Sequence, residues 1–139
     1  MLSMPFQIDL NLSFAVDMSL AVFLWLVQCI LYPSLRYLRS DVFVNWHTTY
    51  QRRVSMIIGP ILLLQMALVS FEALYQPSVP TMIRLSLLSI CWLVTAVVSV
   101  PLHRKIERGE AREQSIERLI QTNWIRTVAW TSLFVTHLL

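Results

Sequence analysis

The sequence predicts an all-α integral membrane protein, an antiparallel four-helix transmembrane bundle with short helical extensions into the cytoplasm. Of its 139 residues, 56% are hydrophobic and only 14% are charged, whereas charged residues make up about 25% of a typical soluble domain. The apolar residues fall in long blocks rather than alternating. Each block is long enough to cross a bilayer, which takes roughly 20 mostly apolar residues in a helix.

Four such blocks predict four spans, near Ser13–Leu35, Val54–Tyr75, Met82–Leu102 and Leu119–Leu139. The first block lacks the basic leader and the A-x-A cleavage pattern of a signal peptide, so we expect it to be retained. We find no internal repeat and no pattern of a second domain. Residues 1–139 are therefore expected to form a single membrane domain.

The cations predict how the bundle is oriented. They gather in the first and third connections, at Arg36, Arg39, Arg52, Arg53, Arg104, Lys105, Arg108, Arg112 and Arg118. The second connection carries Arg84 alone. Because short loops rich in Lys and Arg stay in the cytoplasm, both termini should lie outside it. The net charge of +3 is thus a topology signal and does not indicate nucleic-acid binding.

Both cation-rich connections have helical patterns. One helix is predicted from about Asp41 to Tyr75, with its first three turns in the cytoplasm, because no helix breaker occurs before Gly59-Pro60. The third connection pairs acids and bases at spacings of three and four residues, which favours exposed helix. Gly109 is its expected turn, so the third and fourth spans should form a hairpin.

Pro60 predicts a bend in the second span. It removes the hydrogen bond to the carbonyl of Met56 and clashes with it. The bend either makes room for a ligand or is one of the prolines that membrane helices tolerate. Both interpretations stay open on the sequence alone.

The fourth block contains an arginine at membrane depth. If the span ends by Leu139, it begins by about Ile120, and Arg126 lies roughly 9 Å inside the membrane. Insertion scales give a cost of about 2.5–3.5 kcal/mol for such an arginine, so it should face the bundle interior or water. Helical spacing places Asn123, Trp130 and His137 on the same face.

No acidic side chain is expected near Arg126. Asp17 and Glu72 should both lie on the order of 15 Å away along the membrane normal. The side chains level with Arg126 are neutral: Gln28, Gln65 and Tyr32. An arginine in neutral surroundings favours an anionic or carbonyl-bearing ligand, with snorkelling toward the headgroups and structural hydrogen bonding as alternatives.

Two histidines mark the cytoplasmic rim. His47, Tyr50 and Arg53 share one helix face, and His103 ends the third span, so an antiparallel bundle brings both histidines to similar heights. Zinc sites need three or four ligands, and no metal-ligand spacing occurs. No metal site is predicted, and an acid–base role competes with a purely interfacial one. Trp92 and Trp130 should be central, packed in the bundle or lining a pocket.

The motifs H-x-x-Y-x-x-R, P-x-H and N-W-x-R-T-x-x-W resemble those of small bacterial four-span proteins similar to the anthrone-oxygenase-like family. The matching residues are His47, Tyr50, Arg53, Gly59, Pro60, Pro101, His103, Asn123, Trp124, Arg126, Thr127 and Trp130. The resemblance implies a multi-pass protein of the bacterial inner membrane, and oxidation of a polycyclic anthrone by oxygen without a defined cofactor motif. It also implies an acid in the middle of the second span, where this chain has Gln65.

Two functional hypotheses follow. In the first, a pocket in the cytoplasmic leaflet binds or oxidises an aromatic, phenolic or quinone-like molecule. His47, Tyr50 and His103 would be the catalytic groups, and the ligand-binding set would be Arg53, Asn123, Arg126, Trp92, Trp130, Gln28 and Gln65. In the second, the protein is a non-catalytic subunit or assembly factor that meets membrane lipid, a second copy or a larger complex. A channel is disfavoured, because no paired intramembrane charges are expected.

Overall fold

Four helical rods make up the part of the chain that the computed structural model describes, residues 10–138. Rod 1 comprises α1 (Leu10–Leu26), η1 (Val27–Leu31), α2 (Tyr32–Ser34) and η2 (Leu35–Tyr37), and rod 2 is α3 (Ser40–Tyr75). Rod 3 comprises α4 (Val79–Val94), η3 (Thr95–Ser99) and α5 (Val100–Glu107), and rod 4 is α6 (Arg112–Val135). The predicted all-α fold is confirmed, and α3 begins within one residue of the expected start.

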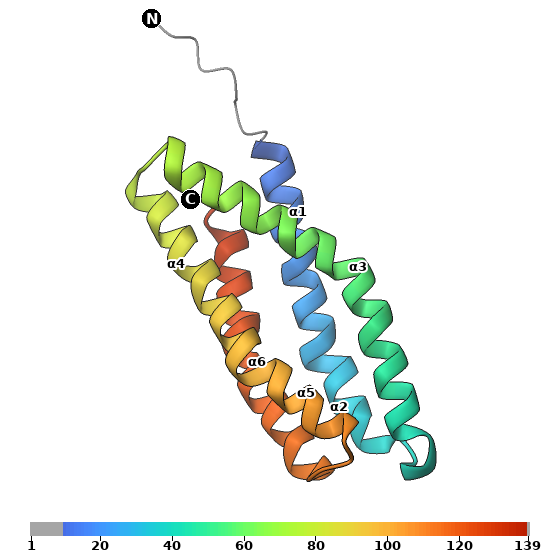
Figure 1. Cartoon of the computed structure of the whole chain (residues 1–139). Coiled ribbons are helices and arrows are strands. Elements are labelled where there is room, and N and C mark those ends of the chain that lie inside the picture. The colour runs from blue at the N-terminus through green and yellow to red at the C-terminus, as the bar shows by residue number, and fades with distance from the viewer. Residues whose placement is uncertain (1–9, 139) are drawn as a thin grey trace, which may run out of the picture.

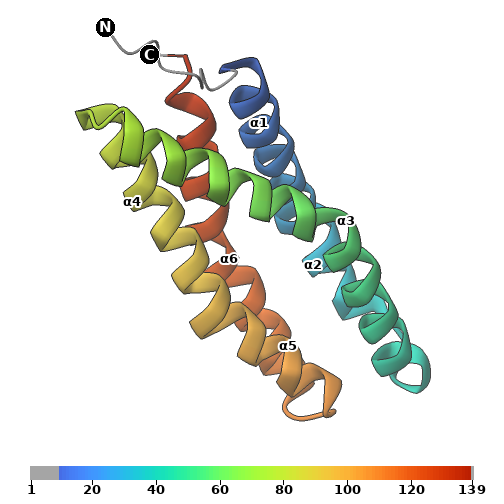
Figure 2. The same ribbon diagram turned by 45° about the horizontal axis from the view of Figure 1, so that its top comes forward.

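Consecutive rods run antiparallel and lie side by side (Figures 1 and 2). α1 contacts α3 and α6, and α4 contacts the same two helices, so α1 and α4 face each other across the bundle. Two buried apolar clusters fill the interior. One includes Leu20, Leu88 and Trp130, and the other includes Phe43, Ile106 and Leu119.

The bundle carries apolar side chains outside and many polar ones inside. α3 exposes Met56, Ile57 and Leu63, and α4 exposes Leu93. The buried polar residues include Asp17, Gln28, Gln65, Arg84, Asn123 and Arg126. Soluble proteins rarely bury charged groups, whereas polar residues inside membrane bundles face the interior and pair with one another.

Three segments of the described chain are long and apolar enough to cross a membrane: Asn11–Tyr37, Ser40–Tyr75 and Val79–Glu107. They indicate a membrane location. The fourth predicted span coincides largely with α6, which does not reach the same apolar character because Arg118, Gln121, Asn123 and Arg126 interrupt it. Its final residue, Leu139, lies outside the described residues.

The ribbon of α3 bends near its middle (Figures 1 and 2). The helix contains Pro60 yet remains one element from Ser40 to Tyr75. The missing N–H of a proline is a known cause of such a bend. Gly59, just before it, has no heavy atom within 4 Å of where a Cβ would lie, so this part of α3 is loosely packed.

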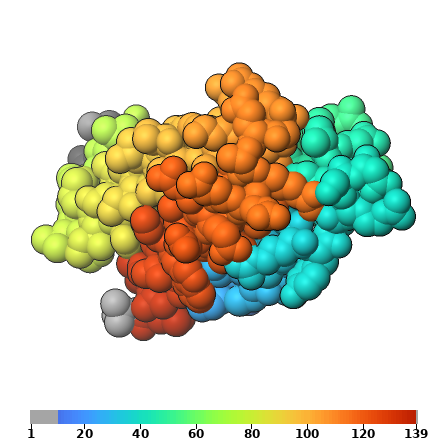
Figure 3. Space-filling view, turned by 90° about the horizontal axis from the view of Figure 1, so that it is seen from below, coloured from blue at the N-terminus to red at the C-terminus, as the bar shows by residue number. Residues whose placement is uncertain are grey.

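The two cation-rich connections lie at the same end of the bundle, next to each other (Figure 3). Arg112 donates to the Ser40 hydroxyl at 3.2 Å and lies over the Phe43 ring. Gly109 has a φ of 71° and forms the predicted turn. The next N–H, of Glu110, closes the end of α5 on the carbonyl of Lys105 at 2.9 Å.

The orientation of this basic end stays a prediction, and cysteine labelling tests it. Gln76, between α3 and α4, and Gln114, in the first turn of α6, are both exposed and belong to opposite ends of the bundle. The native Cys29 and Cys91 are free thiols that can be removed. An impermeant reagent added to intact cells should label Gln76→Cys but not Gln114→Cys, because the basic end faces the cytoplasm. Labelling of Gln114→Cys alone would reverse the orientation.

Candidate functional site

The polar face predicted on α6 points into the bundle. Asn123, Arg126, Thr127 and Trp130 are all buried, and Arg126 is only 8% exposed. His137 lies beyond the end of α6 and joins a different group of side chains. The residues of this face therefore belong to two separate polar regions of the interior.

Arg126 has neutral surroundings, as predicted. Its Nη1 donates to Asn123 Oδ1 at 3.2 Å and to Ser99 Oγ at 3.3 Å. The guanidinium carbon lies 5.4 Å from the centre of the Trp130 ring, within the range of a cation–π contact. Its Nε is buried without a hydrogen-bond partner.

Two π-helical turns supply the side chains around Asn123 and Arg126. Gln28 lies in η1 and accepts a hydrogen bond from Asn123 Nδ2 at 2.9 Å, while Ser99 lies in η3. Gln28 also donates to the carbonyl of Ile120 at 3.1 Å. Such turns insert a residue into an α-helix and occur frequently at functional sites. Gln28 thus reaches Arg126 only through Asn123.

The two histidines, which were expected at similar heights, are in direct contact. His47 Nε2 lies 3.0 Å from His103 Nδ1, and His103 Nε2 lies 3.0 Å from the Tyr32 hydroxyl. His47 is fully buried, and its Nδ1 has no partner. Three titratable groups therefore form a hydrogen-bonded chain. Within residues 10–138, no group of three or more His, Cys, Asp or Glu side chains could hold a metal ion.

A cavity of about 200 Å³ lies between the bend of α3 and the other rods. We call it the central cavity. Its polar lining consists of Tyr32, Tyr50, Gln51, Ser55, Thr95, Ser99, His103 and Arg126, and its apolar lining of Phe23, Val27, Val54, Ile58, Gly59, Leu62 and Val100. Two lining residues, Gln51 and Arg126, have a buried N–H group without a partner.

Several predicted site residues do not line the central cavity. Arg53 is exposed. Trp130 is buried in the apolar core and donates from Nε1 to Gln65 at 2.9 Å, and Trp92 packs against that core. The apolar wall that we expected from the two tryptophans is instead formed by Phe23, Ile58 and Leu62.

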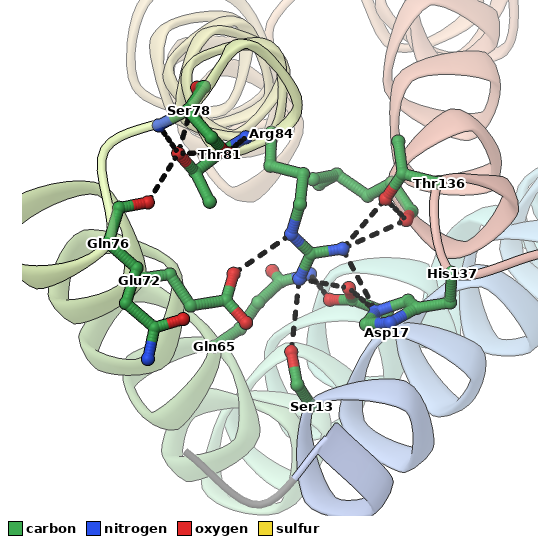
Figure 4. A network of polar contacts seen from close by, with 11 residues as sticks. Ser13, Asp17, Gln65, Glu72, Gln76, Ser78, Thr81, Arg84, Thr136 and His137 are labelled. Atoms are coloured by element: carbon green, nitrogen blue, oxygen red, sulfur yellow. Dashed lines mark hydrogen bonds and ion pairs between the residues drawn. The ribbon is translucent and has the colours of Figure 1, made fainter. Parts of the chain in front are cut away.

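A second polar region surrounds Arg84 near the end of the bundle where α3 meets α4 (Figure 4). We call it the ion-pair cluster. It consists of Ser13, Asp17, Gln65, Glu72, Arg84, Thr136 and His137. The guanidinium of Arg84 lies 2.9 Å from Asp17 Oδ2 and 3.0 Å from Glu72 Oε2. The expectation of no paired intramembrane charges is therefore wrong.

This cluster is not evident from the sequence, because Arg84 stands beside the second connection and has the pattern of a loop cation. Arg84 lies inside α4 and is 5% exposed. Asp17 is in the second turn of α1, Glu72 in the last turn of α3 and Arg84 in the second turn of α4. Counting turns from the connection at Gln76 would have placed all three charges at the same level.

A short chain of hydrogen bonds connects the two polar regions. Trp130 donates to Gln65 Oε1, and Gln65 Nε2 donates to Asp17 Oδ1 at 2.6 Å. Trp130 also carries the Arg126 guanidinium over its ring. Gln65, predicted as a ligand-binding residue, is thus the link between Asp17 and the core.

Comparison with known proteins finds no matching family model, no matching curated protein and no matching solved structure. The resemblance to the anthrone-oxygenase-like family therefore remains a prediction that rests on the short motifs alone.

The ion-pair cluster predicts a large difference between two arginine variants. Arg84→Met should destabilise the protein by about 3–5 kcal/mol, because it leaves two buried carboxylates without a counter-charge. Arg36→Met is the matched control: its pair with Glu117 is as short, at 2.7 Å, but about half exposed, so its loss should cost about 0–1 kcal/mol. Thermal unfolding in detergent, followed by circular dichroism, measures both. Equal losses would contradict the assignment.

Proposed function

We propose that the protein binds a single-ring phenolic or quinone-like molecule in the central cavity. The observation that carries the proposal is the cavity's lining. It combines an apolar wall with Gln51 and Arg126, each of which has a buried N–H group without a partner. Small-molecule sites are mostly apolar cavities with a few convergent polar groups. A ring with one or two oxygens has an apolar body and a polar edge, which match the apolar and polar parts of the cavity lining.

The volume of the cavity suits a ligand with one ring. An engineered apolar cavity of about 150 Å³ binds benzene, and the central cavity measures about 200 Å³. A substituted phenol or a benzoquinone head group fits this space, whereas the three fused rings of an anthrone need more. The proposal is therefore narrower than the substrate class that the family resemblance implies.

Arg126 is the proposed partner of the ligand oxygen. Its Nη1 is held by Asn123 and Ser99, so the guanidinium is fixed before a ligand arrives. Its Nε is the buried donor without a partner. A fixed cation beside the ligand oxygen favours the phenolate over the neutral phenol.

The chain Tyr32–His103–His47 is the proposed route for the phenolic proton. Each of its two contacts measures 3.0 Å, which is a hydrogen-bond distance. A neutral histidine carries one donor and one acceptor nitrogen, so the chain can point either way. Tyr32 and His103 both line the cavity. General acid–base catalysis requires the catalytic group to lie within hydrogen-bond distance of the proton that it transfers. In the catalytic form of the proposal, oxidation of the bound phenol by oxygen, this chain removes the proton.

The competing function is a non-catalytic subunit whose polar groups only hold the rods together. The observation that favours it is the closed set of bonds from Asn123 to Gln28, Arg126 and Thr127, which ties α6 to η1. The two functions differ in whether the cavity must stay open.

Filling the cavity separates the two functions. Gly59→Leu places a side chain where no heavy atom lies within 4 Å and replaces a poor helix former, so folding should be preserved. Titration calorimetry with hydroquinone should detect binding to the wild type and a loss of at least tenfold in Gly59→Leu. Ala67→Leu, at an exposed position of the same helix outside the cavity, should bind normally. Equal affinity in all three proteins would favour the non-catalytic subunit.

Arg126→Lys tests the role of the guanidinium. Lysine keeps the charge but lacks the planar fork that binds an oxygen from two nitrogens. The variant should insert and fold as the wild type does but lose a co-purifying phenol or quinone in native mass spectrometry. Identical bound species in both proteins would assign Arg126 a structural role.

A further inference from the structure

The ion-pair cluster contains one more negative than positive charge. Asp17 and Glu72 both contact the single guanidinium of Arg84. The side chains are almost fully buried, at 1% exposure for Asp17 and 6% for Arg84. An uncompensated buried charge is costly, and such a group usually gains or loses a proton instead. Charge balance thus calls for one additional positive charge in the cluster.

His137 lies where that charge is needed. Its Nε2 is 2.7 Å from Asp17 Oδ2 and 2.9 Å from Arg84 Nη1. An arginine nitrogen only donates and a carboxylate only accepts, so Nε2 cannot satisfy both neighbours with one fixed hydrogen. Arg84 Nη1 has two other acceptors, Thr136 Oγ1 at 2.7 Å and the carbonyl of Leu133 at 3.3 Å, and does not depend on His137.

We propose that the ion-pair cluster is a proton-binding site, in which one exchangeable proton is shared between Asp17 Oδ2 and His137 Nε2. With this proton the charges of the cluster balance. Without it the cluster keeps an excess negative charge that Arg84 and the Gln65 amide only partly offset. The site is separate from the central cavity and does not depend on the ligand proposed there.

The geometry favours a proton over a metal cation. Both oxygens of Asp17 already accept hydrogens, Oδ1 from Gln65 at 2.6 Å and Oδ2 from Arg84 and His137. Sodium or calcium would need several free oxygens, and the adjacent guanidinium would repel it. A proton requires only the contact of 2.7 Å that is already present.

Side chains from all four rods surround His137. Asp17 from α1 and Arg84 from α4 contact it, and Glu72 from α3 lies on the other side of the Arg84 guanidinium (Figure 4). On the side of α6 and α1, the rings of Phe134 and Phe14 pack together, and Phe14 meets His137 edge-on at 5.7 Å. His137 is 10% exposed and Glu72 9%, so protons can reach the cluster from the end of the bundle.

Nitrogen NMR on protein labelled with ¹⁵N-histidine tests the site in lipid nanodiscs. The chain has three histidines, and His137→Gln assigns the signal. In the wild type at neutral pH, both ring nitrogens of His137 should carry a hydrogen, because Nε2 holds the shared proton. In Glu72→Gln, which removes the excess negative charge, the hydrogen on Nε2 should be lost. Glu113→Gln, at an exposed position, is the matched control and should keep the wild-type signals.

Two results would overturn the proposal. One is a wild-type His137 ring that carries a hydrogen on only one of its two nitrogens. The other is a set of His137 signals that does not differ between the wild type and Glu72→Gln, as expected for a histidine that is independent of the cluster. If Glu72→Gln does not fold, the wild-type spectrum still decides the first question. Hydroquinone binding that persists in Glu72→Gln would keep this proposal separate from that for the central cavity.

Discussion

The guanidinium of Arg84 contacts each of the other three rods. It donates to Asp17 and Ser13 on α1, to Glu72 on α3, and to Thr136 and the Leu133 carbonyl at the end of α6. In an apolar environment the hydrophobic effect gives helices little reason to associate, so packing and buried polar contacts must hold them together. A single side chain that reaches all four rods therefore fixes their relative heights. The rest of the bundle, including the space beside α3, depends on that alignment.

The arginines of the two polar regions differ in how many of their nitrogens form hydrogen bonds. Arg84 uses all three of its nitrogens, whereas Arg126 leaves its Nε unpaired beside a cavity. Arg84 faces two carboxylates, and Arg126 faces amide, hydroxyl and aromatic groups. The contacts of Arg84 tie the rods together, whereas Arg126 keeps one N–H group available for a ligand. Trp130 and Gln65 lie between them, so a change at either end can be transmitted through two hydrogen bonds.

Periodicity and residue chemistry predicted the helices, the buried face of α6, the turn at Gly109 and the similar heights of His47 and His103. Each of these depends on local spacing or on the antiparallel order of the rods. The sequence did not reveal the role of Arg84, because a cation close to a loop has the same local pattern whether it is exposed or buried. It also did not reveal η1 and η3. The residue inserted in each turn changes which side chains face inward, and only the packing of the whole bundle selects that alternative over an α-helix.

The two π-helical turns make the polar interior sensitive to the loss of a single residue. A turn of this kind holds one more residue than the α-helix it replaces, so a one-residue deletion within 27–31 or 95–99 would restore a regular helix without breaking the rod. It would also change which side chains of that turn face inward, and so remove Gln28 from Asn123 or Ser99 from Arg126. A chain of common ancestry that lacked one of these residues would therefore keep the same rods without this polar interior.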